Sequence, residues 1–171
     1  MLKILATICI IGMATSSCTS KKASRTESSH EAEPELTMIV GTYTSGDSKG
    51  LYSFRFNEEN GTATALSEAE VENPSYLVPS ADGKFIYAVS EFSNDQAAAN
   101  AFAFNKEEGT FRLLNTQKTE GEDPCYIITN GSNVITANYS GGSISVFPID
   151  KDGSLLPAST VVKFKGSGAD K

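Results

Sequence analysis

The side chains best suited to chemistry in this chain lie in short segments that occur in more than one copy. They are a carboxylate, a carboxamide and four phenols: Glu91, Asn138, Tyr43, Tyr76, Tyr126 and Tyr139. A carboxylate can accept a proton or bind a hydroxyl group, a carboxamide offers donor and acceptor together, and a tyrosine joins an apolar ring to a polar tip. This set suits the binding of a polar small molecule.

Each of these residues also has a purely structural interpretation. A carboxylate at a strand end is more often solvated than catalytic, and tyrosines more often pack between sheets than contact a substrate. Asn138 and Tyr139 precede Gly141 and Gly142, which permit close approach of the backbone. The glycine pair could instead cradle a phosphate, but no helix pattern follows it, which favours a flexible turn.

Histidine and cysteine are scarce. The single histidine is His30, in a polar N-terminal segment, and Cys125 is the only cysteine beyond Cys18. Without a histidine base we expect Cys125 to be a small, half-buried residue and not a nucleophile. The same scarcity argues against Ser-His-Asp triads, histidine-containing zinc sites and an internal disulfide. We expect no metal and no cofactor.

The charge balance excludes one class of partner. The formal net charge is −7. Nucleic-acid binding needs clustered Lys and Arg to contact phosphates, so we expect no nucleic-acid partner.

The hydrophobic pattern beyond Met38 is that of strands. Apolar residues alternate or form short β-branched and aromatic runs such as FIYAVS and SISVFPI, and no helical stripe exceeds two turns. This pattern predicts an all-β domain.

A repeat identifies the kind of β domain. NPSYLVPSADGKFIYAVSEF begins at Asn73, and a looser copy, DPCYIITNGSNVITANYSGG, begins at Asp123, with Pro74 and Pro124 fifty residues apart. Turn glycines recur at Gly61, Gly109 and Gly153. A repeat of about 40–50 residues that contains several strands is typical of β-propeller blades.

Superimposing the copies predicts a unit of four strands, A to D, and eleven strands in all. The predicted strands are, for A, 75–78 and 125–129; for B, 39–44, 85–90 and 133–139; for C, 51–56, 100–105 and 143–149; for D, 62–66, 111–115 and 160–164. The blades span approximately 38–70, 73–119 and 123–171, and the first lacks strand A. Because a ring needs at least about four blades, we expect an incomplete ring and a fragment of a longer protein.

The N-terminus predicts export. Residues 1–18 combine one lysine, an apolar run too short to span a membrane, and small residues before Cys18. This is typical of a bacterial lipoprotein signal, with Cys18 as the lipidated residue, although ordinary signal cleavage nearby is the alternative. Residues 19–36 are polar and predict a disordered tether ahead of a domain at 37–171. The expected location is the bacterial cell envelope, on the periplasmic or outer-membrane face.

Antiparallel strands place the candidate residues together. Successive connections alternate between the two faces of a propeller. The NPSY and DPCY segments therefore share a face with the segments that follow strands B: GTYTSG, AVSEFS and ANYSGG. All six candidate residues lie on this face, and the turns with Gly, Asn and Asp at positive φ lie on the other.

These segments also resemble a known family. VGTYTSG, NPSY before DGKFIYAVSE, DPCY and especially TANYSGGSISVFPIDKDGSL are similar to the lactonase family of seven-bladed β-propellers, the 6-phosphogluconolactonase type. The resemblance implies three of seven blades here and hydrolysis of a sugar lactone such as 6-phosphogluconolactone. It also implies a Pro-His-x-His motif beyond Lys171, so no catalytic residue can be named by motif.

Two other functions stay open from the sequence. One is a noncatalytic propeller that binds a ligand or protein while anchored to a membrane through Cys18. The other is a truncated product with no activity.

Overall fold

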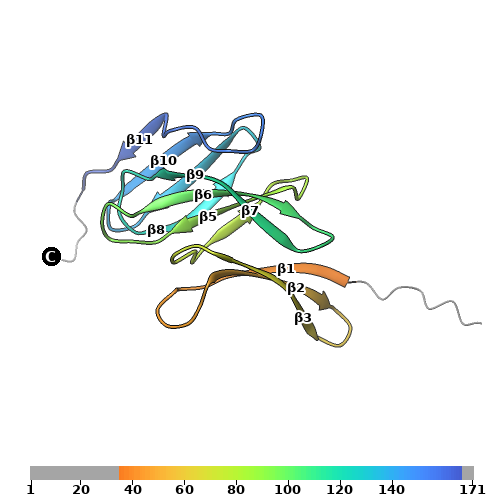
Figure 1. Ribbon diagram of the computed structural model, residues 1–171. Helices are drawn as coiled ribbons and strands as arrows, with labels where there is room; N and C mark the ends of the chain where they lie inside the picture. The colour runs from red at the N-terminus through yellow and green to blue at the C-terminus, as the bar shows by residue number, and fades with distance from the viewer. Residues whose placement is uncertain (1–34, 167–171) are drawn as a thin grey trace, which may run out of the picture. The chain divides into compact units, whose positions relative to one another are not determined.

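The computed structural model describes residues 35–166, which form β-strands joined by turns and no helix (Figure 1). Its strands make three antiparallel sheets in chain order. Sheet 1 contains β1 (Glu35–Gly41), β2 (Gly50–Asn57) and β3 (Ala63–Glu70); sheet 2 contains β4 (Leu77–Pro79), β5 (Phe85–Ser90), β6 (Ala98–Asn105) and β7 (Thr110–Lys118); sheet 3 contains β8 (Pro124–Thr129), β9 (Asn133–Asn138), β10 (Ser143–Pro148) and β11 (Thr160–Lys163). The predicted all-β class and the eleven strands are confirmed.

Strand order confirms the predicted four-strand unit. Sheet 2 runs β4-β5-β6-β7 and sheet 3 runs β8-β9-β10-β11, so both have the order A, B, C, D. Sheet 1 has the order β1-β2-β3, and among the described residues no strand pairs with the outer edge of β1. Strand A is therefore missing from sheet 1, as the repeat predicted.

The first strand begins and ends earlier than predicted. A strand was expected over 39–44, but β1 starts at Glu35, and Leu36, placed by the sequence in the tether, pairs with Phe56. The pairing of β1 with β2 ends at Gly41, where the Pro74 carbonyl occupies the space that a side chain would need. Residues 1–34, with His30 and Cys18, lie outside the described part.

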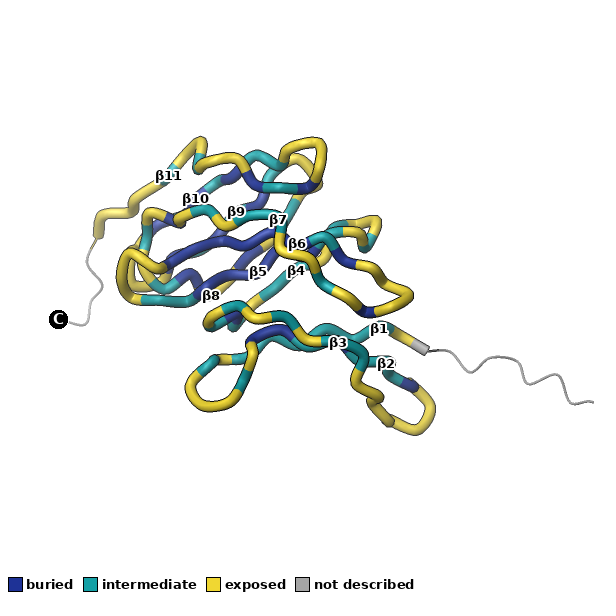
Figure 2. Tube along the Cα trace, in the orientation of Figure 1, coloured by how far each residue is buried: buried dark blue, intermediate teal, exposed yellow. Residues whose placement is uncertain are grey.

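Sheet 2 lies between the other two and buries both faces (Figure 2). Ile86 and Ala88 pack with Leu51 of sheet 1, whereas Tyr87 and Val89 pack with sheet 3. Side chains alternate across a strand, so the two faces of β5 contribute to two different cores. This explains why FIYAVS is an unbroken apolar run.

A similar hydrogen bond joins each pair of neighbouring sheets. Ser53 Oγ donates to the Gly109 carbonyl at 2.6 Å, and Tyr87 Oη donates to the Gly153 carbonyl at 3.1 Å. Both carbonyls belong to C–D turn glycines with positive φ, as predicted for these turns. At Gly153 a side chain would also collide with the Phe85 ring. These glycines therefore set the spacing between sheets as well as the turn geometry.

The described residues include no helix that could cross a membrane.

Candidate functional site

The loops that follow the B strands meet the loops that precede the A strands. Tyr43 follows β1, Asn73 and Ser75 lie between β3 and β4, and Glu91 directly follows β5. A hydrogen bond from the Glu91 amide to the Asn73 carbonyl, at 3.0 Å, joins two of these loops. The structure thus brings together segments from different sheets at one end of the strands.

Glu91 lies at the centre of a cluster of three side chains, with Tyr43 and Ser75, which we refer to as the Glu91 cluster. Tyr43 Oη donates to Glu91 Oε2 at 2.9 Å, and Ser75 Oγ donates to the same oxygen. The carboxylate is half-buried, so it is not the freely solvated group that is common at strand ends. One carboxylate therefore links sheet 1 to sheet 2 through two hydroxyl groups.

The same contact changes the acidity of Tyr43. Its hydrogen bond to Glu91, partial burial and the negative charge of Glu91 raise the pKa of the phenol above its usual value. Tyr43 therefore stays protonated, and a donor, at neutral pH. Its ring is 57% exposed, which leaves it open to a ligand.

Tyr76 and Tyr126 form an aromatic pair between sheets 2 and 3. Their ring centroids are 4.8 Å apart at an interplanar angle of 50°. The side chains are 43% and 41% exposed. They contact one another, as expected for packing between blades, and still present ring surface to solvent.

Two residues with strained backbone conformations lie in the loops at this end of the strands, which together form a rim around Glu91. Asn73 (φ 47°) and Asp123 (φ 51°) each precede a proline and have positive φ, a region that Asn and Asp tolerate better than most residues. Asn73 Oδ1 accepts from the Thr44 amide at 3.0 Å, and the Asp123 carbonyl accepts from the Tyr139 amide at 2.9 Å. The strained pair fixes the loops around Glu91, and strain of this kind is concentrated at functional sites.

Asn138 and Tyr139 are adjacent in sequence but have different surroundings. Asn138 is 2% exposed, and its carboxamide bonds to three side-chain hydroxyls, those of Thr136, Ser143 and Ser145. Its polar atoms therefore stabilise the interior of sheet 3. Tyr139 is 81% exposed at the end of β9.

Cys125 differs from its expected environment. A half-buried thiol was predicted, but the side chain is exposed. Cys125 lies on β8 at a shift in the pairing register, where Pro124 pairs with Asn138, Tyr126 pairs with Ala137 and Cys125 has no partner in β9. This irregularity breaks the inward and outward alternation, so that Cys125 and Tyr126 are both exposed, and the sequence alone did not predict it.

The glycine pair forms a turn, as the sequence favoured. Gly142 has φ 51° and donates its amide hydrogen to the Tyr139 carbonyl at 3.2 Å. Gly141 lies directly against the Gly121–Glu122 backbone. Within residues 35–166, no group of three or more His, Cys, Asp or Glu side chains is arranged to hold a metal ion.

Sequence reasoning missed Ser75 and Asn73 as members of the cluster. Both lie in the repeated Asn/Asp-Pro-Ser/Cys-Tyr segment, whose tyrosine alone was selected. An Asn or Asp before proline at the same place in two copies was the available signal, because it marks a backbone position with special requirements.

Comparisons with known proteins agree with this architecture. The family model "Lactonase, 7-bladed beta-propeller" matches residues 37–171. The 6-phosphogluconolactonase of Bacillus subtilis is 36% identical over 135 residues, which cover 75% of this chain and 38% of that protein.

Two solved structures have the same fold. A protein of Bacteroides fragilis solved as a candidate 6-phosphogluconolactonase is 73% identical with a TM-score of 0.79, covering 80% of this chain and 38% of that one. The periplasmic gluconolactonase of Pseudomonas aeruginosa is 31% identical with a TM-score of 0.70, and the match covers 75% of this chain and 39% of that one. The chain spans less than half the length of these relatives. It belongs to the lactonase family of seven-bladed β-propellers.

Proposed function

We propose that this chain supplies part of the substrate-binding face of an enzyme that hydrolyses a sugar lactone. The observation that carries the proposal is the convergence of Tyr43, Ser75 and Glu91 from two sheets, beside the Tyr76–Tyr126 pair. Relatives named for 6-phosphogluconolactone and for gluconolactone support this substrate class.

The cluster matches the chemistry of a sugar lactone. A sugar ring has hydroxyl groups at its edges and C–H bonds on its faces. The Glu91 carboxylate accepts hydrogen bonds from hydroxyls, and Tyr43, whose own O–H is donated to Glu91, can accept one through its phenolic oxygen. The exposed ring surface of Tyr76 and Tyr126 suits a C–H face.

Lactone hydrolysis makes two demands on the enzyme. Water attacks the carbonyl carbon, the ring C–O bond breaks, and the product is a hydroxy acid that releases one proton near neutral pH. The attacking water needs a base, and the oxyanion that develops needs hydrogen-bond donors. The Glu91 cluster holds and orients the ring in this proposal, since positioning alone can supply a large part of a rate enhancement.

Proton release measures the reaction directly. The full-length protein that carries this chain is expected to accelerate gluconolactone or 6-phosphogluconolactone opening well above the spontaneous rate in a pH-stat. The double variant Tyr76→Ala/Tyr126→Ala of the same protein tests the aromatic pair. It should raise KM, because it removes the ring surface proposed to contact the sugar. Opening of several sugar lactones at no more than the spontaneous rate would favour the noncatalytic binding propeller instead.

We also infer that the domain is exported and anchored through a lipid on Cys18. The support is the apolar run followed by small residues before that cysteine. Mass spectrometry of the mature N-terminus should find a diacylglyceryl-modified Cys18; an unmodified terminus at another residue would show ordinary signal cleavage.

A further inference from the structure

We propose that the Glu91 cluster selects an unphosphorylated sugar lactone and disfavours its phosphorylated counterpart. This inference rests on the proposed function, which leaves the choice between the two open. It concerns the charge of the substrate, and it comes from the distribution of charged side chains around the site.

No cationic side chain pairs with Glu91 in the described part of the chain. Its carboxylate accepts hydrogen bonds from the hydroxyls of Tyr43 and Ser75, which are neutral groups. The ion pairs of Lys49 with Glu70, Lys84 with Asp82 and Lys118 with Asp95 do not include Glu91. A ligand beside Glu91 therefore meets an uncompensated carboxylate.

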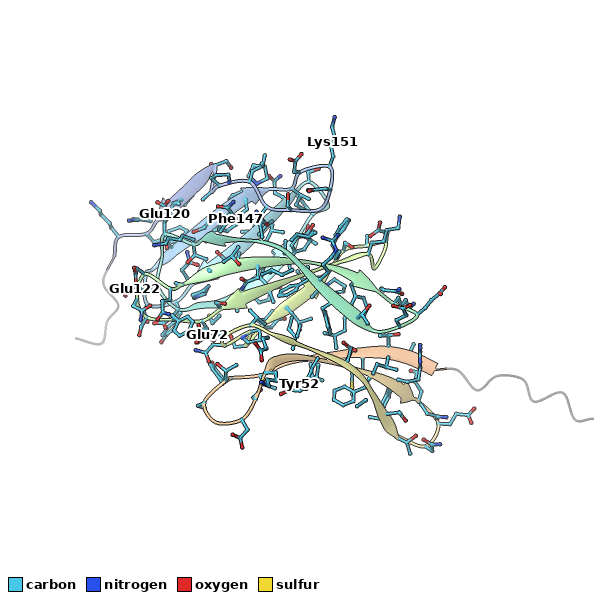
Figure 3. The ribbon with its side chains drawn as sticks, in the orientation of Figure 1. Tyr52, Glu72, Glu120, Glu122, Phe147 and Lys151 are labelled. Atoms are coloured by element: carbon cyan, nitrogen blue, oxygen red, sulfur yellow. The ribbon has the colours of Figure 1, made fainter. Side chains whose placement is uncertain are left out.

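The surrounding loops add more negative charge. Acidic residues in the connecting segments at this end of the sheets are Asp47, Glu72, Asp95, Glu120, Glu122 and Asp123, and the basic residues in these segments are Lys49 and Lys165. Figure 3 shows Glu72, Glu120 and Glu122 at the same end of the sheets, with Lys151 well away from them. The described part of this rim therefore carries more acidic than basic side chains.

The cations near this end are poorly placed to bind a phosphate at the cluster. Lys49 lies 2.8 Å from Glu70, and Lys118 lies 3.8 Å from Asp95. Lys163 lies on β11 and Lys165 lies two residues beyond it, and β11 is separated from β8 and its Tyr126 by two strands, or about 14 Å of sheet. Phosphate recognition uses Arg, Lys or clustered backbone amides aimed at the oxygens.

The hydroxyl groups of a sugar are neutral, so the surrounding carboxylates do not repel them. A carboxylate and a phenol can satisfy the hydroxyls of a neutral sugar, whereas a phosphate dianion placed among carboxylates is repelled. The cluster is therefore complementary to the hydroxyl groups that both lactones carry, and it repels the phosphate group that only one of them carries.

The test compares gluconolactone with 6-phosphogluconolactone in the full-length protein. At an ionic strength of about 0.01 M, where screening is weak, kcat/KM is expected to be about tenfold or more higher for gluconolactone. Raising the ionic strength to about 0.15 M should reduce this ratio, because salt screens repulsion of the anionic substrate only. An equal or higher kcat/KM for the phosphorylated lactone would overturn the inference and leave the proposed function standing.

Variants that remove charge test whether the carboxylates of this rim cause the preference for the unphosphorylated lactone. The double variant Glu72→Gln/Glu122→Gln should increase kcat/KM for 6-phosphogluconolactone about threefold, with little change for gluconolactone. Glu108→Gln, which alters a carboxylate in the C–D turn at the opposite end, is the matched control and should change neither. An unchanged ratio in the double variant would contradict the assignment.

If neither lactone is hydrolysed, the proposed function is refuted. Selection by charge can then still be tested by measuring binding. Isothermal titration calorimetry of the full-length protein can report binding of gluconolactam and of its 6-phosphate, two analogues with a stable amide in the ring. Tighter binding of the unphosphorylated lactam is expected. Equal or tighter binding of the phosphate, or no binding of either, would contradict selection by charge.

Discussion

At the scale of single residues, hydroxyl groups make several of the hydrogen bonds between neighbouring sheets. Tyr43 and Ser75 bind Glu91 at the site, and Tyr87 donates to the Gly153 carbonyl between sheets 2 and 3. Tyr87 is buried within an apolar core, and burial together with the charges of Asp82 and Asp152 raises its pKa to about 12. The sequence identified Tyr43 as a candidate, but its partner could not be predicted, because the contact depends on how two sheets are placed.

Tyr87 predicts a loss of stability at high pH. A tyrosine with a raised pKa binds its proton more tightly in the folded state, so its contribution is fully present below the unfolded pKa of about 10 and is lost as pH rises toward about 12. We expect the free energy of unfolding to fall by roughly 2 kcal/mol over this window. Urea unfolding at a series of pH values measures it. Tyr87→Phe should remove most of the slope, and an equal slope in both proteins would refute the assignment.

At the scale of elements, turn chemistry serves two purposes. The sequence predicted the C–D turns and their positive φ from Gly, Asn and Asp, because those preferences are local. It could not show that Gly109 and Gly153 also lie against the preceding sheet, which is a tertiary contact. Gly61 occupies the same place in sheet 1, with positive φ but no atom within 4 Å of where a Cβ would be.

This difference gives a matched pair of substitutions. Gly61→Ala should cost about 1 kcal/mol, the penalty for a side chain at positive φ. Gly153→Ala should cost about 3 kcal/mol, since the added methyl also collides with the Phe85 ring. Chemical denaturation of both variants provides the comparison. Equal losses would mean that Gly153 is needed for its backbone angle alone.

At the scale of the whole molecule, the described sheets leave apolar surface uncovered. The outer face of sheet 3 carries Ile135, Ile144 and Val146, which are only half-buried although their strand neighbours are buried. The outer edge of β1 is unpaired among the described residues. The repeat predicted this incomplete ring because the number of strands can be counted from it, whereas the strand limits depend on pairing with neighbouring strands, such as that of Leu36 with Phe56.

The 171-residue chain on its own is therefore expected to self-associate. Sedimentation velocity should show species larger than a monomer that increase with concentration. Replacing Ile144 and Val146 with Glu should shift the distribution toward the monomer, while the same change at exposed Thr64 on β3 should not. A monodisperse, cooperatively melting monomer would contradict the expectation.

The central claim is that the Glu91 cluster binds the substrate of a lactone hydrolase. The most direct test is kcat/KM for gluconolactone in the full-length protein with Glu91→Gln, which keeps the shape of the side chain and removes its charge. Loss of hydrogen bonds to a charged group predicts a decrease of roughly tenfold to a hundredfold. Glu108→Gln should retain wild-type values. A Glu91→Gln protein within about twofold of wild type would show that the cluster is a structural contact and not part of the site.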